Sequence, residues 1–147
     1  TSFGTLSILY NNLLPGRAKR NIANYFGLPD TVFASWLYSI VYIRNICAHH
    51  CRLWNKALSI RPLMPRSPRK PFVTLPANGT RQVYFILSMI VYLLDIINPN
   101  HSFVTRFKDL LNRYPSIDVR AMGFPPEIRI FLFPVESKLL GNPNFFH

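Results

Sequence analysis

Residues 31–54 read TVFASWLYSIVYIRNICAHHCRLW, a stretch without glycine or proline. Asp30 precedes it and can cap a helix, because a carboxylate at that position accepts a hydrogen bond from a backbone N–H of the first turn. Apolar residues recur at helical spacing on one face that runs from Phe33 to Cys51. The stretch therefore predicts a long central helix, from Thr31 to about Trp54, around which the rest of the fold is built.

Shorter helical patterns flank the central stretch on both sides. Two precede it, at 5–14 and 17–26, and each ends at a turn that contains glycine. Two follow it, at 81–97 and 103–114. The pattern at 81–97 is apolar on every side, but its uninterrupted part is shorter than the roughly 20 residues that a bilayer needs. We therefore expect a buried core helix there, no membrane span, and an all-α domain of five helical segments.

A proline-rich connection at 57–80 and a tail complete the chain. The five prolines of the connection exclude a regular helix or a central strand. Its cations could grip the phosphates of a nucleic acid, or could simply be solvated on a linker. These cations are Arg61, Arg66, Arg69 and Lys70. We expect one helical domain at 1–126 and an irregular tail of uncertain structure at 127–147.

Positive charge is concentrated in the first part of the chain. Residues 1–94 carry 11 Lys or Arg against Asp30 alone, whereas residues 95–147 carry 6 against 5 acids. This imbalance favours a polyanion partner, and nucleic acid is the commonest one, although a basic protein with a solvated surface has the same composition. A two-metal nuclease needs several carboxylates to hold its ions. We therefore expect RNA as a partner and no metal ion or other cofactor.

The chain has two cysteines, Cys47 and Cys51, four residues apart. This usage suits packing in a reducing compartment better than a disulfide framework, so we expect a cytoplasmic protein with both thiols in its core. His50 shares a helical face with them, but structural zinc needs four ligands and no second pair lies nearby. The chain begins with Thr and without a leader, and we expect it to be the C-terminal part of a longer protein.

A polar cluster, Arg44-Asn45-Ile46-Cys47-Ala48-His49, occupies the end of the central helical pattern. Arg44 falls within the apolar face, where a polar group costs stability unless it meets another polar group, a partner chain or a ligand. Imidazole can act as a base or an acid near neutrality, and guanidinium can stabilise a charged phosphorane. The set suits metal-free RNA cleavage by attack of the 2′-hydroxyl, which leaves a 2′,3′-cyclic phosphate and a 5′-hydroxyl.

Several blocks of sequence, in a fixed order, carry a resemblance to known families. Arg44-Asn45-x-x-x-His49 is similar to the R-x(4 to 6)-H signature of HEPN ribonuclease domains, and the wider order resembles abortive-infection (Abi-like) proteins of bacteria over roughly residues 2–126. The blocks are SFGTLS at 2–7, SWL at 35–37, RNICAHH at 44–50, RLWN at 52–55, LDIINP at 94–99 and MGFP at 122–125.

The resemblance implies an all-α HEPN-like bundle, a homodimer with a composite active site, metal-independent endoribonuclease activity, and a role in phage defence or as a toxin with a possible antitoxin. It implies that Arg44 is the phosphate-stabilising cation, that Asn45 is a hydrogen-bonding positioner, and that His49 is the base or acid. On an ideal helix Asn45 and His49 align, whereas Arg44 and His49 diverge by about 140°. Either the helix loosens near His49, or Arg44 reaches across, or the partner subunit completes the site.

Structural interpretations of the same residues stay open. His49 can hydrogen-bond the helix end, Arg44 can form an ion pair with Asp95, and Arg52 is an RNA contact or a plain surface charge. For the whole protein, the alternative is a non-catalytic RNA-binding or regulatory module of the HEPN-like kind. A third possibility is a helical docking domain in which Arg44 and His49 only stabilise the core.

Overall fold

A computed structural model describes residues 2–70, 72–73 and 79–125, and over these residues it contains helices and no strand. The α-helices are α1 (Phe3–Asn12), α2 (Arg17–Tyr25), α3 (Asp30–Ala48), α4 (Val83–Ile97) and α5 (Phe103–Arg113). Two short 3₁₀ helices are η1 (Gly79–Arg81) and η2 (Arg120–Met122). The predicted all-α class with five helices is confirmed, and the predicted tail at 127–147 lies outside the described residues.

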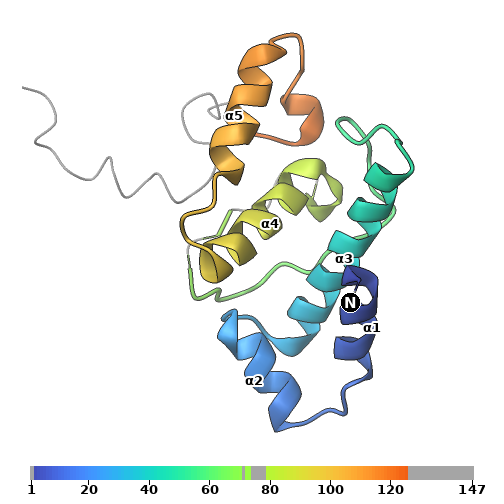
Figure 1. Ribbon diagram of the computed structural model, residues 1–147, viewed down its shortest axis with the longest axis vertical. Coiled ribbons are helices and arrows are strands. Elements are labelled where there is room, and N and C mark those ends of the chain that lie inside the picture. Colours follow the sequence, from blue (N-terminus) through green and yellow to red (C-terminus); the bar gives the residue numbers. More distant parts are fainter. Residues whose placement is uncertain (1, 71, 74–78, 126–147) are drawn as a thin grey trace, which may run out of the picture.

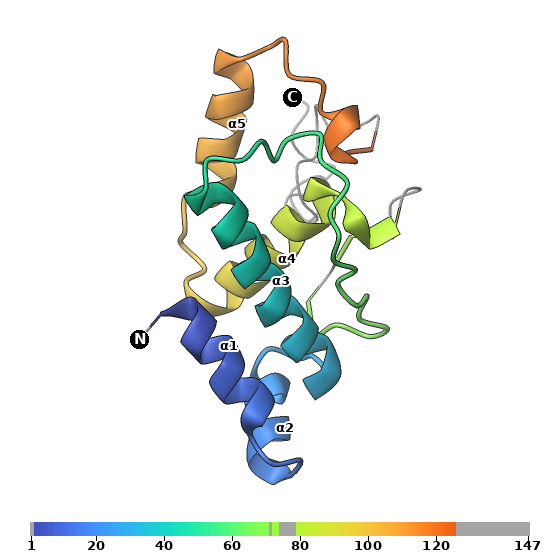
Figure 2. The same ribbon diagram turned by 90° about the vertical axis from the view of Figure 1, so that its right-hand side faces the viewer.

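Helix α1 lies along α3 and runs in the opposite direction (Figure 1 and Figure 2). Near the end of α1, the Tyr10 ring meets the Phe33 ring edge to face, with centroids 4.9 Å apart. Near its start, Gly4 lies beside the Val41 side chain. Because α1 begins opposite Val41, its helical residues do not run beside the last two turns of α3.

The core lies between α3 and α4. Trp36 of α3 is fully buried, and its indole N–H donates to the Leu63 carbonyl oxygen at 2.8 Å. Its ring packs against Phe72 and Tyr92, with centroids 5.2 and 5.5 Å away. Helix α4 buries most of its length, as predicted for a core helix. Within the described ranges, every helix is too short or too polar to cross a bilayer.

The connection after α3 is irregular up to η1 in its described part, and it is anchored to the helices. The Leu63 N–H donates to Ser35 Oγ at 3.0 Å, which holds the connection against α3. The Leu58 N–H donates to the Arg81 carbonyl oxygen at 2.9 Å, and Arg81 Nε donates back to the Leu58 carbonyl oxygen at 2.6 Å. The proline-rich segment therefore has fixed points on both α3 and the approach to α4.

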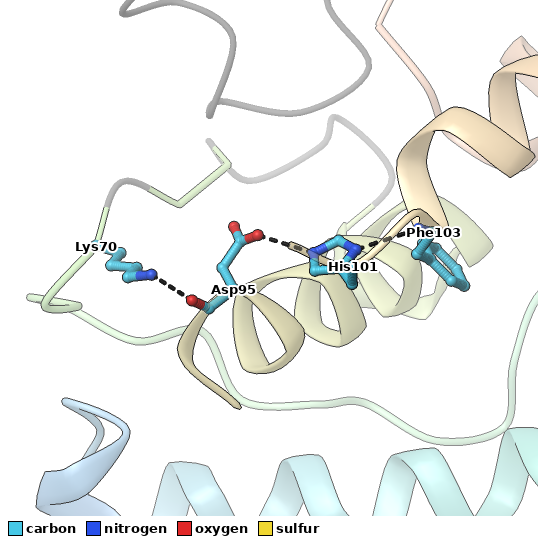
Figure 3. Close-up of polar contacts among 4 residues, drawn as sticks. All are labelled: Lys70, Asp95, His101 and Phe103. Atoms are coloured by element: carbon cyan, nitrogen blue, oxygen red, sulfur yellow. Dashed lines mark hydrogen bonds and ion pairs between the residues drawn. The ribbon is translucent and has the colours of Figure 1, made fainter. Parts of the chain in front are cut away.

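A cluster of Lys70, Asp95 and His101 joins the connection, the end of α4 and the approach to α5 (Figure 3). His101 Nε2 lies 2.9 Å from Asp95 Oδ1, and His101 Nδ1 accepts the Phe103 N–H at 3.2 Å. A ring nitrogen that accepts carries no proton, so the His101 ring donates from Nε2 to Asp95. Lys70 Nζ donates to the Asp95 carbonyl oxygen at 2.7 Å. Asp95 pairs with His101, and the predicted alternative pair of Arg44 with Asp95 is wrong.

Phe124 closes the core near the start of α4. Gly123 has a φ of 89° and lets the chain turn inward after η2. A Cβ at this glycine would overlap the Gln82 side chain, so the turn also needs close backbone approach. Phe124 is then buried with its ring centroid 4.8 Å from that of Tyr84 and 5.8 Å from that of Phe107.

Candidate active site

Helix α3 ends at Ala48, six residues before the predicted end. His49 is the C-cap, and His50 follows with a φ of 53°, in the left-handed region. Histidine is one of the few residues besides glycine that adopts this conformation with any frequency. The chain turns away from the helix axis there, so Arg52 and Trp54 lie on the connection and not on the central helix that was predicted to include them.

Two backbone hydrogen bonds close this end of α3. The His50 N–H donates to the Cys47 carbonyl oxygen at 3.0 Å, and the Cys51 N–H donates to the Ile46 carbonyl oxygen at 3.1 Å. This pair of bonds, around a left-handed residue, is the Schellman motif, which satisfies carbonyl groups that a helix end leaves unpaired. The position after the C-cap is usually glycine, and His50 takes it here.

The three predicted catalytic side chains are exposed to solvent. Arg44 and Asn45 lie on the last turn and a half of α3, and His49 lies at its cap. The predicted burial of Arg44 in an apolar face is therefore wrong, and Arg44 does not lower stability in the way that a buried polar group would. The side of the helix end that carries these groups is uncovered because α1 begins opposite Val41, whereas Ile43 and Ile46 on the other side are buried. A phosphodiester can approach exposed groups, so this placement suits the predicted chemistry.

Arg44 turns toward Asn45. Its Nη1 donates to Asn45 Oδ1 at 3.2 Å, and this contact brings the guanidinium to the side of α3 that carries Asn45. Asn45 and His49 are one turn apart, and the His49 N–H donates to the Asn45 carbonyl oxygen at 3.0 Å. No hydrogen bond in the described part of the chain engages the His49 imidazole. The structure thus brings Arg44 and Asn45 together, with His49 one turn further along.

Both cysteines near this site are free, exposed thiols. The expectation that they pack in the core is wrong, because Cys47 lies on the uncovered end of α3 and Cys51 lies beyond the helix. Cys51 Sγ is 3.7 Å from the His49 carbonyl oxygen. Across the residues that the structure describes, no three His, Cys, Asp or Glu side chains gather in a way that could hold a metal ion.

Tyr42 lies about one turn before Asn45, on the same side of α3. A hydrogen bond with the Ser59 side chain lowers the pKa of Tyr42, and a hydrogen bond with the Ser59 backbone and the charge of Lys56 act in the same direction, against the effect of burial. Ser59 and Lys56 of the connection therefore lie beside α3. The sequence patterns did not indicate Lys56 as a candidate, because the turn at His50 that brings it back carries no glycine.

The predicted RNA contacts fall into two groups. Arg69 Nη2 and Nη1 donate to the carbonyl oxygens of Asn24 and Tyr25 at 3.0 and 3.4 Å, and Lys70 binds the Asp95 carbonyl oxygen. These two cations hold helix ends. The others are exposed, with no hydrogen bond or ion pair in the described ranges, and they are Arg52, Arg61 and Arg66.

One comparison with known proteins bears on this region. Residues 1–55 match the model of the Abi-like protein family. The match includes α1, α2 and α3 and the whole polar cluster, and the predicted resemblance is confirmed for these residues. No curated protein and no solved structure matches the chain.

Proposed function

We propose that this chain, Abi-like over residues 1–55, is a metal-independent endoribonuclease that acts in phage defence by abortive infection, or as a toxin. The observation that carries the proposal is the exposed end of α3, where the Arg44 guanidinium contacts Asn45 and the His49 imidazole lies one turn away. A cation, a hydrogen-bonding amide and a proton carrier are the groups that 2′-hydroxyl attack on a phosphodiester requires.

His49 acts as the base or the acid of this reaction. The base takes the proton of the 2′-hydroxyl as the bond between the 2′-oxygen and phosphorus forms. The acid gives a proton to the 5′-oxygen as its bond to phosphorus breaks. Imidazole can perform either transfer near neutral pH, and its exposure at the cap of α3 leaves it open to a bound strand.

Arg44 stabilises the negative charge that develops on the phosphoryl oxygens. A guanidinium suits this task because its planar fork of N–H donors matches two phosphate oxygens at once. Asn45 holds that fork by accepting from Nη1 at 3.2 Å, and it orients the guanidinium toward the side of α3 that leads to His49. Asn45 is therefore a positioning residue for Arg44, with its amide N–H₂ group left to donate to the substrate.

The reaction moves two protons, whereas each chain offers one His49 at this site. Two copies of the chain facing one strand would supply a base and an acid, which is the reason to propose a homodimer with a composite site. The exposed Arg52, Arg61 and Arg66 provide charge for the flanking phosphates. An antitoxin that covers α3 would silence such an enzyme.

The test is to incubate the purified protein with RNA in the presence of a chelator. We expect fragments with 2′,3′-cyclic phosphate ends, and a fall in rate of about 10²- to 10⁴-fold in His49→Ala. The matched control is His50→Asn, which removes the adjacent imidazole and keeps a residue that tolerates a positive φ. It should cleave as the wild type does. Cutting by His49→Ala at the wild-type rate would reject the site.

A non-catalytic RNA-binding or regulatory module is the second candidate. It is favoured by three exposed cations, Arg52, Arg61 and Arg66, which bind no other group in the described part of the chain. In that case the protein would bind RNA with an affinity that falls steeply with salt concentration, and no fragments would form.

A further inference from the structure

Four side chains form one strip along α3, which we name the α3 strip: Tyr38, Tyr42, Asn45 and His49. At 100° per residue they fall within about 60° of one another around the helix. The strip joins two groups of the proposed catalytic site to two aromatic rings. The two rings lie nearer the start of α3, and Asn45 and His49 lie nearer its end.

Tyr42 and Tyr38 differ in how they are held. The Tyr42 ring is half-buried, and Ser59 and Lys56 of the connection lower the pKa of its hydroxyl. The Tyr38 side chain is 58% exposed, and its ring contacts no other aromatic ring among the described residues. Tyr42 thus faces the connection, whereas the ring face of Tyr38 is open to solvent.

Within the first 94 residues, the charged side chains beside the strip are positive. Arg44 and Lys56 lie next to it, and Asp30, the only acid of the first 94 residues, is at the opposite end of α3. A backbone of phosphates would be attracted along this side of the helix. An exposed ring on such a surface offers an apolar π-face to the bases of the strand to which the phosphates belong.

We propose that Tyr38 is a stacking platform for an unpaired base of the bound strand, a few nucleotides from the phosphate that meets Arg44 and His49. The inference rests on the proposed function for the identity of the ligand as RNA. It adds the substrate class, which is single-stranded. In an A-form duplex each base is covered by its neighbours and the deep groove is closed to side chains, so a ring on a helix surface can stack only on a base that has left the duplex.

Binding of a cleavage-proof ligand tests the platform. The probes are a fluorescent 2′-O-methyl oligouridylate and its duplex with the complementary 2′-O-methyl oligoadenylate, and binding is followed by fluorescence anisotropy. Tyr38→Ala should weaken binding of the single strand by about tenfold, and it should leave binding of the duplex unchanged. Tyr38→Trp should bind the single strand at least as tightly as the wild type. Tyr38→Leu keeps apolar area without a π-face and should resemble Tyr38→Ala.

Tyr25 provides the matched control. It is 59% exposed, close to the value for Tyr38, and it ends α2, at the end of α3 that lies away from His49 (Figure 1). Tyr25→Ala should bind both probes as the wild type does. An equal loss of affinity for both probes in Tyr38→Ala, or no loss for either, would overturn the platform. So would a change in oligomeric state without a change in binding, since the strip would then be a protein contact.

The outcome separates the two proposals. The probes lack the 2′-hydroxyl that the proposed reaction needs, so binding that depends on Tyr38 can be observed even if the protein cleaves nothing. Conversely, cleavage can depend on His49 while Tyr38→Ala keeps the wild-type preference for the single strand over the duplex. That result would refute the platform and leave the proposed function standing.

Discussion

Helices α2 and α3 end in the same backbone motif, built from different residues. At α2 the left-handed residue is Gly27, with a φ of 65°, and at α3 it is His50, with a φ of 53°. The Leu28 N–H donates to the Ala23 carbonyl oxygen at 3.1 Å, which matches the bond from Cys51 at the end of α3. Glycine adopts this conformation without steric cost, whereas a residue with a Cβ does not.

The surroundings of the two helix ends differ as well. Leu28 and Ala23 are buried, and Arg69 and Tyr92 donate to the last carbonyl oxygens of α2. At α3 the corresponding residues are Cys51, which is exposed, and Ile46, which is buried, and the described residues include no cationic side chain bound to the carbonyl oxygens there. The end of α2 is built for stability. The end of α3 carries a costly residue among exposed polar groups, which is the pattern found where local structure serves a site.

The largest expected effect is on cleavage at the end of α3. Arg44→Ala should lower the cleavage rate by about 10²- to 10³-fold, because one donor to the developing charge is lost. The melting temperature should stay within about 1 °C of the wild type, since Arg44 is exposed and its one side-chain hydrogen bond within the described residues is to Asn45. Initial rates of cleavage and a thermal melt measure the two quantities.

Arg66→Ala is the matched control for Arg44→Ala. It also removes one exposed arginine from the basic part of the chain, but from the connection. A comparable loss of rate in Arg66→Ala would mean that the charge of the surface, and not the position of Arg44, drives cleavage.

The next effect concerns the end of α2. Gly27→Ala should lower the free energy of unfolding by about 2 kcal/mol, because the new Cβ takes a left-handed φ and overlaps the Arg69 side chain. Urea denaturation measures it. RNA cleavage should be unaffected at temperatures where the variant is folded. An unchanged denaturation midpoint would show that the end of α2 does not contribute to stability in the way that distinguishes it from the end of α3.

A smaller effect of opposite sign is expected at the end of α3. His50→Gly should raise the free energy of unfolding by about 0.5–1 kcal/mol, because glycine removes the cost of the left-handed backbone and no packing is lost at an exposed position. The same denaturation experiment applies. A destabilised His50→Gly variant would show that the imidazole itself holds the helix end.

The smallest effect is a pH dependence. The folded state lowers the pKa of Tyr42 below its usual value near 10, so its ionisation stabilises the fold as pH rises through that range. Burial raises the pKa of Tyr10, Tyr84 and Tyr92, so the stability that their neutral form gives is present below about pH 10 and is lost above it. Tyr42→Phe should therefore steepen the alkaline loss of stability, measured by urea midpoints at several pH values. If stability falls with pH at the same slope in the variant, Ser59 and Lys56 do not lower the pKa of Tyr42.

The five helices could be predicted because their apolar spacing and their glycine and proline stops are local signals. Helix α4, for example, differs from its predicted range only in its first two residues. The end of α3 could not be predicted, because His50 performs the role of a stop glycine and the residues after it continue a helical pattern. The exposure of Arg44 and Cys47 was missed for a related reason. A helical wheel shows which side is apolar, but not that the neighbouring helix begins only opposite Val41.

The cations of the connection show the same limit. Arg66 and Arg69 each follow a proline in the sequence, yet Arg69 binds carbonyl oxygens at the end of α2 while Arg66 makes no hydrogen bond within the described residues. Which cation is engaged depends on the path of an irregular segment around the helices, and spacing alone does not determine such a path. The contact between Arg44 and Asn45 was not predicted, because neighbouring side chains on a helix do not face each other, and only the reach of the long arginine side chain brings Nη1 to 3.2 Å from Asn45 Oδ1.

The central claim is that a 2′-hydroxyl is the nucleophile at the site on α3. The most direct measurement uses a DNA oligonucleotide in which a single residue is a ribonucleotide, incubated with the protein in chelator. We expect one cut, on the 3′ side of that ribonucleotide, with a 2′,3′-cyclic phosphate end and with no cut in His49→Ala. Cleavage of the same oligonucleotide at deoxyribonucleotides, or cleavage that persists in His49→Ala, would contradict it.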